Sequence, residues 1–103
     1  MRKYEIMYIL KADLDEAARK AEMEKLAKIL TDNGAEVTKT DESMGLRDLA
    51  YPIKKETKGY YVVLKVTMGN EAISEFNRLA RINNSVLRHL IVVDHEWEDN
   101  LND

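Results

Sequence analysis

Apolar residues recur along this 103-residue chain at two spacings, the alternation of a β-strand and the three- to four-residue spacing of a helix. The order in which these spacings appear restricts the fold that the chain can adopt. Residues 3–10 alternate between two faces, as a β-strand requires, and the second face is also fairly apolar. One face carries Tyr4, Ile6, Tyr8 and Leu10, and the other carries Glu5, Met7 and Ile9. This run therefore predicts a central strand with one face on the core.

Two later stretches place apolar residues at helical spacing, which predicts two amphipathic helices. Their stripes are Met23, Leu26, Ala27 and Leu30, and then Ile73, Phe76, Leu79 and Ala80. Asp13 and Glu16 stand at the spacing of a capping box, so we expect the first helix to begin at Asp13. Asn33 and Gly34 supply a left-handed stop for this helix, and Asn70 is a suitable cap for the second.

The stretch between these helices predicts two strands joined by a charged turn. The first strand runs over residues 35–51, with a bulge or bend at the polar patch 41–43. Pro52, the single proline of the chain, cannot donate to a ladder and marks a strand end or a sheet edge. Residues 54–59 would make the turn, and residues 60–66 form the most β-rich run.

A last strand over residues 86–93 completes the order β-α-β-β-α-β. Two crossover units joined by a hairpin predict an α+β fold, the ferredoxin-like split β-α-β sandwich. Its four-stranded antiparallel sheet would carry both helices on one face and leave the other face to solvent or a partner. The first and third strands would be central and the second and fourth would be edges, which suits Pro52.

Composition and charge predict one cytosolic domain with an acidic tail. The chain is 45% hydrophobic and 34% charged and has no cysteine, so we expect no disulfide, signal peptide or membrane span. The net charge is −3, but the last ten residues hold five acids and no Lys or Arg. The other 93 residues hold 16 bases and 14 acids, a net charge of +2. We expect a folded domain over residues 1–94 and a flexible tail over residues 95–103.

Catalytic motifs are missing from the sequence. No Ser or Thr stands in a nucleophile elbow and the four glycines are isolated, so we expect no enzyme activity and no cofactor. A metal site is one interpretation of the group His89, Asp94, His95 and Glu96, although its spacing matches no familiar site. An ordinary strand histidine followed by a solvated tail is the preferred interpretation.

Basic and aromatic residues gather at the predicted strand ends, which favours contact with RNA phosphates. They are Arg2, Lys3, Tyr4, Arg47, Tyr51, Lys54, Lys55 and Arg88. The alternative is that residues 54–58 are simply a solvated turn and that Tyr4 belongs to the core. The aromatic signature of the RNA-recognition motif is absent, so binding by shape and backbone is expected.

Five segments carry a family resemblance over residues 1 to about 96. They are Met1-Arg2-Lys3-Tyr4-Glu5, Asn33-Gly34-Ala35, Gly45 to Ile53 with its Leu-Ala-Tyr-Pro-Ile core, Gly59-Tyr60-Tyr61, and Arg81 to Arg88. Together they resemble the bacterial small ribosomal subunit protein six (S-six) family. The Leu-Ala-Tyr-Pro-Ile core is specific at this place in a β-α-β-β-α-β order.

The resemblance implies a structural constituent of the small ribosomal subunit that serves translation. It would bind the central domain of small-subunit ribosomal RNA together with small-subunit ribosomal protein eighteen. We assign RNA binding to Arg2, Lys3, Tyr4, Arg47, Lys54, Lys55 and Arg88, and the protein-partner side to Leu46, Leu49 and Tyr51. The alternative is a homodimeric ferredoxin-like module that senses a small molecule. A hydrolase on this fold would need an arginine after the first strand, and residues 11–13 offer none.

Overall fold

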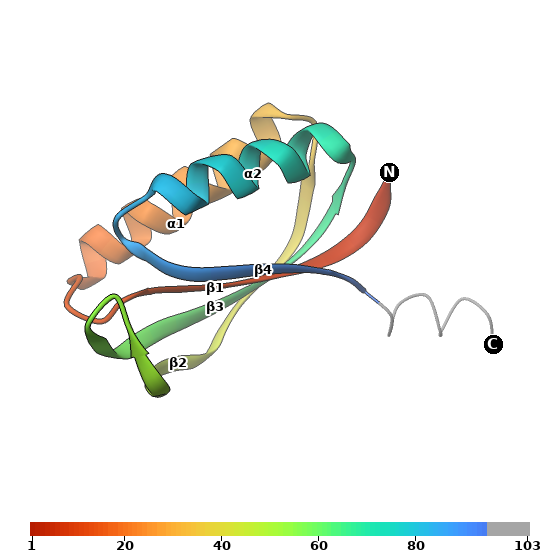
Figure 1. The fold of residues 1–103 in the computed structure, drawn as a ribbon. Coiled ribbons are helices and arrows are strands. Elements are labelled where there is room, and N and C mark those ends of the chain that lie inside the picture. The colour runs from red at the N-terminus through yellow and green to blue at the C-terminus, as the bar shows by residue number, and fades with distance from the viewer. Residues whose placement is uncertain (95–103) are drawn as a thin grey trace.

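The computed structural model describes residues 1–94, so the predicted acidic tail at 95–103 lies outside the described residues. Within them the chain forms four strands and two helices in the predicted order (Figure 1). The elements are β1 (Arg2–Lys11), α1 (Glu16–Asp32), β2 (Glu36–Ile53), β3 (Glu56–Met68), α2 (Asn70–Ile82) and β4 (Val86–Val93).

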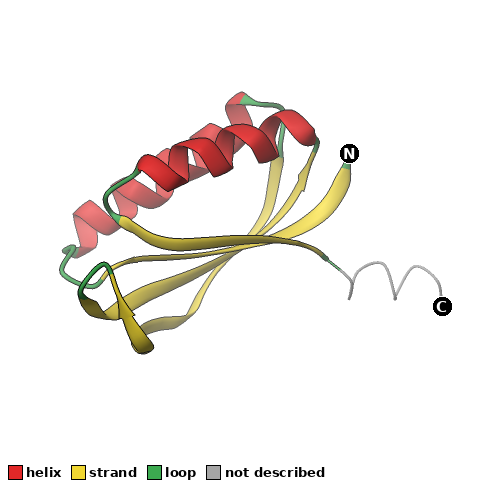
Figure 2. Cartoon of the chain, viewed as in Figure 1, coloured by secondary structure: helices red, strands yellow, loops and turns green. Residues whose placement is uncertain are grey.

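The strands form one antiparallel sheet in the order β2-β3-β1-β4. Strands β1 and β3 are therefore central and β2 and β4 are edges, as the sequence predicts. Helices α1 and α2 lie side by side on one face of this sheet (Figures 1 and 2). The ferredoxin-like split β-α-β sandwich is confirmed.

The core forms where the helical stripes meet the helix-facing side of the sheet. Leu26 and Leu30 of α1 and Phe76 of α2 have no exposed surface, and they join one cluster with alternate residues of β1 and β3. Ile6 and Val62 are equally buried, whereas the intervening positions lie on the open face. Since burying a side chain of this size stabilises a fold by about 1.5–3 kcal/mol, this layer supplies most of the driving force.

Both helices begin at residues other than those expected from the sequence. The cap of α1 is Asp15, whose Oδ1 accepts a hydrogen bond from the backbone N–H of Ala18 at 2.7 Å. The prediction of Asp13 is wrong by two residues because the turn first lets Leu14 pack against the core. The cap of α2 is Gly69, which makes no side-chain capping bond, so the assignment of Asn70 is also wrong. The stop of α1 at Asn33 and Gly34 is confirmed.

The β2–β3 hairpin turns more tightly than the sequence indicates. Only Lys54 and Lys55 lie between the paired residues Ile53 and Glu56, and their φ angles of 50° and 69° are those of a primed two-residue turn. Such a turn matches the twist of the flanking strands, so β3 begins at Glu56. Strand β2 keeps the predicted irregularity, with register shifts between residues 37 and 39, between residues 41 and 45, and between residues 48 and 53, the span that contains Pro52.

Gly59 is a point where three strands meet too closely for a side chain. It pairs with Lys11 of β1 and Arg47 of β2, and a Cβ built on it would overlap Cγ2 of Ile9. We expect Gly59→Ala to lower the free energy of unfolding by about 1–3 kcal/mol, because the packed sheet must shift. Urea unfolding measures this, and the exposed Thr57→Ala should stay within about 0.5 kcal/mol of the wild type. Equal stability of Gly59→Ala and wild type would contradict this packing.

Candidate nucleic-acid interface

The predicted RNA-binding residues fall at two opposite ends of the sheet. Arg2 and Lys3 pair with the last residues of β3, whereas Lys11 pairs with Gly59 next to the hairpin. Figure 1 shows the N-terminus at one end of the molecule and the hairpin turn at the other. At about 3.3 Å per residue, ten residues of β1 separate the two groups by roughly 30 Å. This separation into two ends was not predicted from the sequence, because it depends on the direction in which each strand runs through the sheet.

The hairpin turn contacts the start of β4. The Lys54 ammonium donates to the carbonyl oxygen of Val86 at 3.1 Å. The guanidinium of Arg88 donates to the Tyr51 hydroxyl and stands 5.8 Å from the centre of that ring. We call these four residues the hairpin–β4 contact. It places three of the predicted site residues together, and each cation keeps further N–H groups for a ligand.

Arg47 lies further along β2, with Lys55 at the turn. The Nε of Arg47 donates to the carbonyl oxygen of Met44 at 2.9 Å, which fixes the side chain near the bulge. Arg47 and Lys58 border a shallow hollow together with Asp48, whose carboxylate offsets part of their charge. Lys55 is exposed in the turn itself. The hairpin is therefore basic on more than one side, not a single flat patch.

At the N-terminal end the three predicted residues do not share a face. Tyr4 lies on the helix-facing side and packs against the core cluster, as its alternation with Ile6 requires. Lys3 lies on the opposite face, and Arg2 is exposed at the strand start. The assignment of all three residues to RNA stays a prediction, but Tyr4 can offer RNA only the exposed part of its ring.

Lys65 joins two acidic residues on the open face near this end. Its ammonium lies 3.3 Å from the Asp94 carboxylate and 3.6 Å from that of Glu5. The backbone N–H of Asp94 donates to the carbonyl oxygen of Lys3 at 3.1 Å. Because Asp94 is only 7% exposed, this ion pair helps to hold the end of β4 against β1.

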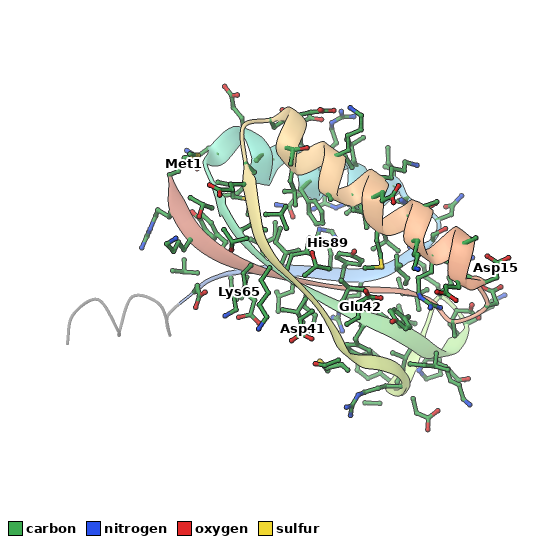
Figure 3. All side chains as sticks on the ribbon, turned by 180° about the vertical axis from the view of Figure 1, so that it is seen from behind. Met1, Asp15, Asp41, Glu42, Lys65 and His89 are labelled. Atoms are coloured by element: carbon green, nitrogen blue, oxygen red, sulfur yellow. The ribbon has the colours of Figure 1, made fainter. Side chains whose placement is uncertain are left out.

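A second polar group connects the bulge of β2 to α1. Glu42, labelled in Figure 3, accepts a hydrogen bond from the hydroxyl of Tyr60 at 2.9 Å. The guanidinium of Arg19 stands 4.2 Å above the Tyr60 ring. Burial raises the pKa of Tyr8, and the charge of the Glu42 carboxylate adds to this effect. These contacts are structural, because they fix the irregular part of β2 against the helix layer.

The predicted protein-partner residues are partly exposed but occupy different sides of β2. Leu46 is 56% exposed and pairs with Tyr60, whereas Tyr51 is 55% exposed and contacts Arg88. Leu49 is half-buried, next to Gly59. The three residues therefore border the hairpin and do not form one continuous patch.

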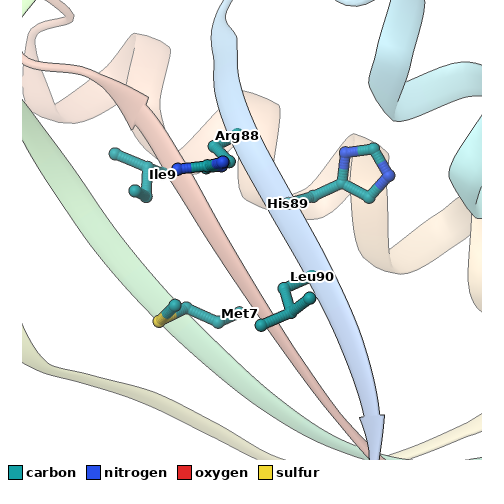
Figure 4. Close-up of a pocket in the computed structure, with 5 residues that line it drawn as sticks. All are labelled: Met7, Ile9, Arg88, His89 and Leu90. Carbon is teal, nitrogen blue, oxygen red and sulfur yellow. The ribbon is translucent and has the colours of Figure 1, made fainter. Parts of the chain in front are cut away.

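The sequence interpretation missed an apolar strip on the open face of β4. Leu90 is 54% exposed and Val92 is 42% exposed. A hollow of about 230 Å³ lies beside them, bordered by Met7 and Ile9 of β1 (Figure 4). The pattern of residues 86–93 could have predicted this strip, because both faces of that strand carry apolar residues although only one face can lie against the helices.

His89 points away from this hollow, toward α2 (Figure 4). Its ring meets Phe76 edge-on with centroids 5.9 Å apart, and its Nε2 lies 3.0 Å from Oδ1 of Asn77. Burial, and then the positive charge of Arg81, lower the pKa of His89.

Residues 1–94 give no support to a metal site, because no three metal-ligating side chains come together among them. His89 packs against α2 and Asp94 pairs with Lys65, while His95 and Glu96 lie outside the described residues. Over the same part of the chain, neither helix has the length and apolar character needed to cross a bilayer.

Comparisons with known proteins identify the class to which this fold belongs. The family model described as ribosomal protein S6 matches residues 3–93. The crystal structure of 30S ribosomal protein S6 from Thermotoga maritima is similar, with a TM-score of 0.89 at 25% identity, over 98% of this chain and 94% of that one. The chain is thus a small-subunit ribosomal protein, of a class that is generally structural rather than enzymatic. It belongs to the ribosomal protein S6 family, which confirms the resemblance of the five sequence segments.

The surroundings of His89 should lower the pKa that a titration of its ring measures. We expect the pKa of His89 to lie below its ordinary value of 6.5, because burial and Arg81 disfavour the charged ring. The unfolded chain takes up this proton first, so stability falls as the pH drops from about 6.5 to the lower folded pKa. NMR titration of the ring measures the pKa, with His95→Gln used to assign the two histidine signals.

Arg81→Gln should raise the pKa of His89 toward the ordinary value, because it removes the neighbouring positive charge. Arg78→Gln is the matched control, since Arg78 lies on the same helix but pairs with Glu75 at 2.8 Å. If Arg81→Gln left the titration of His89 unchanged, burial would be the whole cause of its low pKa.

Proposed function

We propose that this protein is a structural constituent of the small ribosomal subunit that binds the central domain of small-subunit ribosomal RNA in the cytoplasm. It would bind as a pair with small-subunit ribosomal protein eighteen and would carry out no catalysis. The observation that carries the proposal is the hairpin–β4 contact, in a chain of the ribosomal protein S6 family. This contact gathers the cations of Lys54 and Arg88, which suit a phosphate backbone.

The charge balance explains why the chain would need a partner. Residues 1–93 carry a net charge of only +2, so few phosphates can be neutralised at once. Each phosphate contact changes the slope of log affinity against log salt by about 0.7–0.9, and affinity grows with the number of contacts. A basic partner protein would supply the missing contacts, and the acidic residues of this chain would attract it.

The partner side is proposed to follow the edge of β2 through Leu46, Leu49 and Tyr51. The exposed fractions of Leu46 and Tyr51 support this, because each side chain can contact a partner although the two lie on different sides of β2. Leu90 and Val92 add apolar surface on the open face of the other edge strand.

The isolated chain should bind the RNA fragment weakly at physiological salt, and addition of protein eighteen should increase the affinity greatly, because the pair makes more phosphate contacts. Filter binding with labelled RNA, with and without the partner, measures this. Nanomolar binding by the chain alone would contradict the need for a partner. Elution of the tagged chain from cells as a homodimer, without ribosomal RNA or proteins, would favour the small-molecule sensor instead.

Charge reversal at the hairpin tests the RNA-binding residues. Arg47→Glu with Lys54→Glu should weaken RNA binding by the pair about 25-fold or more at ~0.1 M salt, because two phosphate contacts are lost. Incorporation of the variant into small subunits should fall in parallel.

Lys20→Glu with Lys25→Glu is the matched control, since it changes net charge equally on exposed positions of α1. Circular dichroism checks that each variant is folded. Equal incorporation of the hairpin variant and the control would remove the hairpin from the RNA-binding surface.

A further inference from the structure

A second hollow at the hairpin end is bordered by basic residues from three elements. It has a volume of about 270 Å³, several times the roughly 30 Å³ that a water molecule occupies in the liquid. Lys54 borders it from the hairpin turn, Arg81 from the last turn of α2, and Arg88 from β4. Among the described residues that line it there is no Asp or Glu. We call it the basic hollow.

The fold holds two of these cations in place before any ligand arrives. Lys54 is held by the carbonyl oxygen of Val86, which also lines the basic hollow. The guanidinium of Arg88 donates to the hydroxyl of Tyr51 and points toward Ile9, on the other side of β4 from His89 (Figure 4), so Arg88 borders the basic hollow without aiming its charge into it. Side chains that are already ordered lose less conformational entropy on binding, so a ligand here meets a prepared site.

Arg81 was not among the predicted RNA-binding residues, but the structure places its charge at the basic hollow. Arg81 lies in the last turn of α2, and its positive charge lowers the pKa of His89, which also lines the basic hollow. The carbonyl end of a helix carries only about −0.5 of an elementary charge, so the charges of Lys54 and Arg81 outweigh it and the basic hollow favours an anion.

We propose that the basic hollow binds one backbone phosphate of ribosomal RNA, contacted by Lys54 and Arg81. This inference rests on the proposed function and adds Arg81 to its RNA-binding residues. A phosphodiester presents several acceptor oxygens in different directions, and cations from a turn and a helix can approach it from different sides. Such a contact positions the RNA on the protein without reading its sequence.

The test uses the complex of this chain and protein eighteen with the ribosomal RNA fragment. Arg81→Gln should weaken binding about fivefold to eightfold at ~0.1 M salt and lower the salt slope by about 0.7–0.9, as for one lost phosphate contact. Arg81→Lys should restore most of both. Arg78→Gln, one turn earlier on α2 and paired with Glu75, should bind like the wild type.

The outcomes separate this inference from the proposed function. If Arg81→Gln binds like the wild type with the same salt slope, the basic hollow is not a phosphate site, while RNA binding by the complex still stands. If the wild-type complex itself does not bind the RNA, the proposed function fails first. If Arg81→Lys is as weak as Arg81→Gln, loss of packing and not of charge explains the effect, and the inference fails.

A second arm separates RNA phosphate from a free small anion. Inorganic phosphate is titrated into the wild-type chain and into Arg81→Gln, with the backbone amides of Arg88 and His89 followed by NMR. Weak, saturable shifts that Arg81→Gln abolishes support a site for one phosphate of a longer polymer. Micromolar binding of inorganic phosphate would overturn the RNA assignment, because the basic hollow would then be a site for a free anion.

Discussion

Burial of one face of the sheet under α1 and α2 governs the arrangement of both the core and the open face. Ile6 and Val62 are fully buried only because they alternate with positions on the other face, and Phe76 fills the space above them. The same alternation sends Met7, Leu90 and Val92 to the open face, where no element of the described chain covers them. A sheet covered on one side thus provides both a core and an apolar surface for a partner.

The hairpin depends on this sheet for its position. The two-residue turn at Lys54 and Lys55 extends β2 and β3 beyond β1, and the bulge near Gly45 changes the register of β2. The turn then reaches Val86, 32 residues further along the chain. Cations that are separate in the sequence come together by this route, next to the end of α2.

The net charge of residues 1–93 differs from that of the last ten residues. A net charge of +2 over 93 residues gives little general attraction for a polyanion, so position matters more than quantity. The hairpin end gathers basic side chains, whereas Lys65 at the other end is paired with Glu5 and Asp94. The two ends of the domain therefore differ in character, one basic and the other with its charges paired.

Periodicity, Pro52 and the Leu-Ala-Tyr-Pro-Ile core are local signals, so the order of elements, the edge position of β2 and the family could be predicted from the sequence. The helix starts could not, since the choice between Asp13 and Asp15 depends on where Leu14 packs against the core. Which basic residues share a surface depends on the folded chain. Strand direction places Arg2 and Arg88 at opposite ends of the sheet. The hairpin turn brings Lys54 to the start of β4, where Arg81 of α2 also lies. Contacts between residues distant in sequence arise from packing, and no local pattern records them.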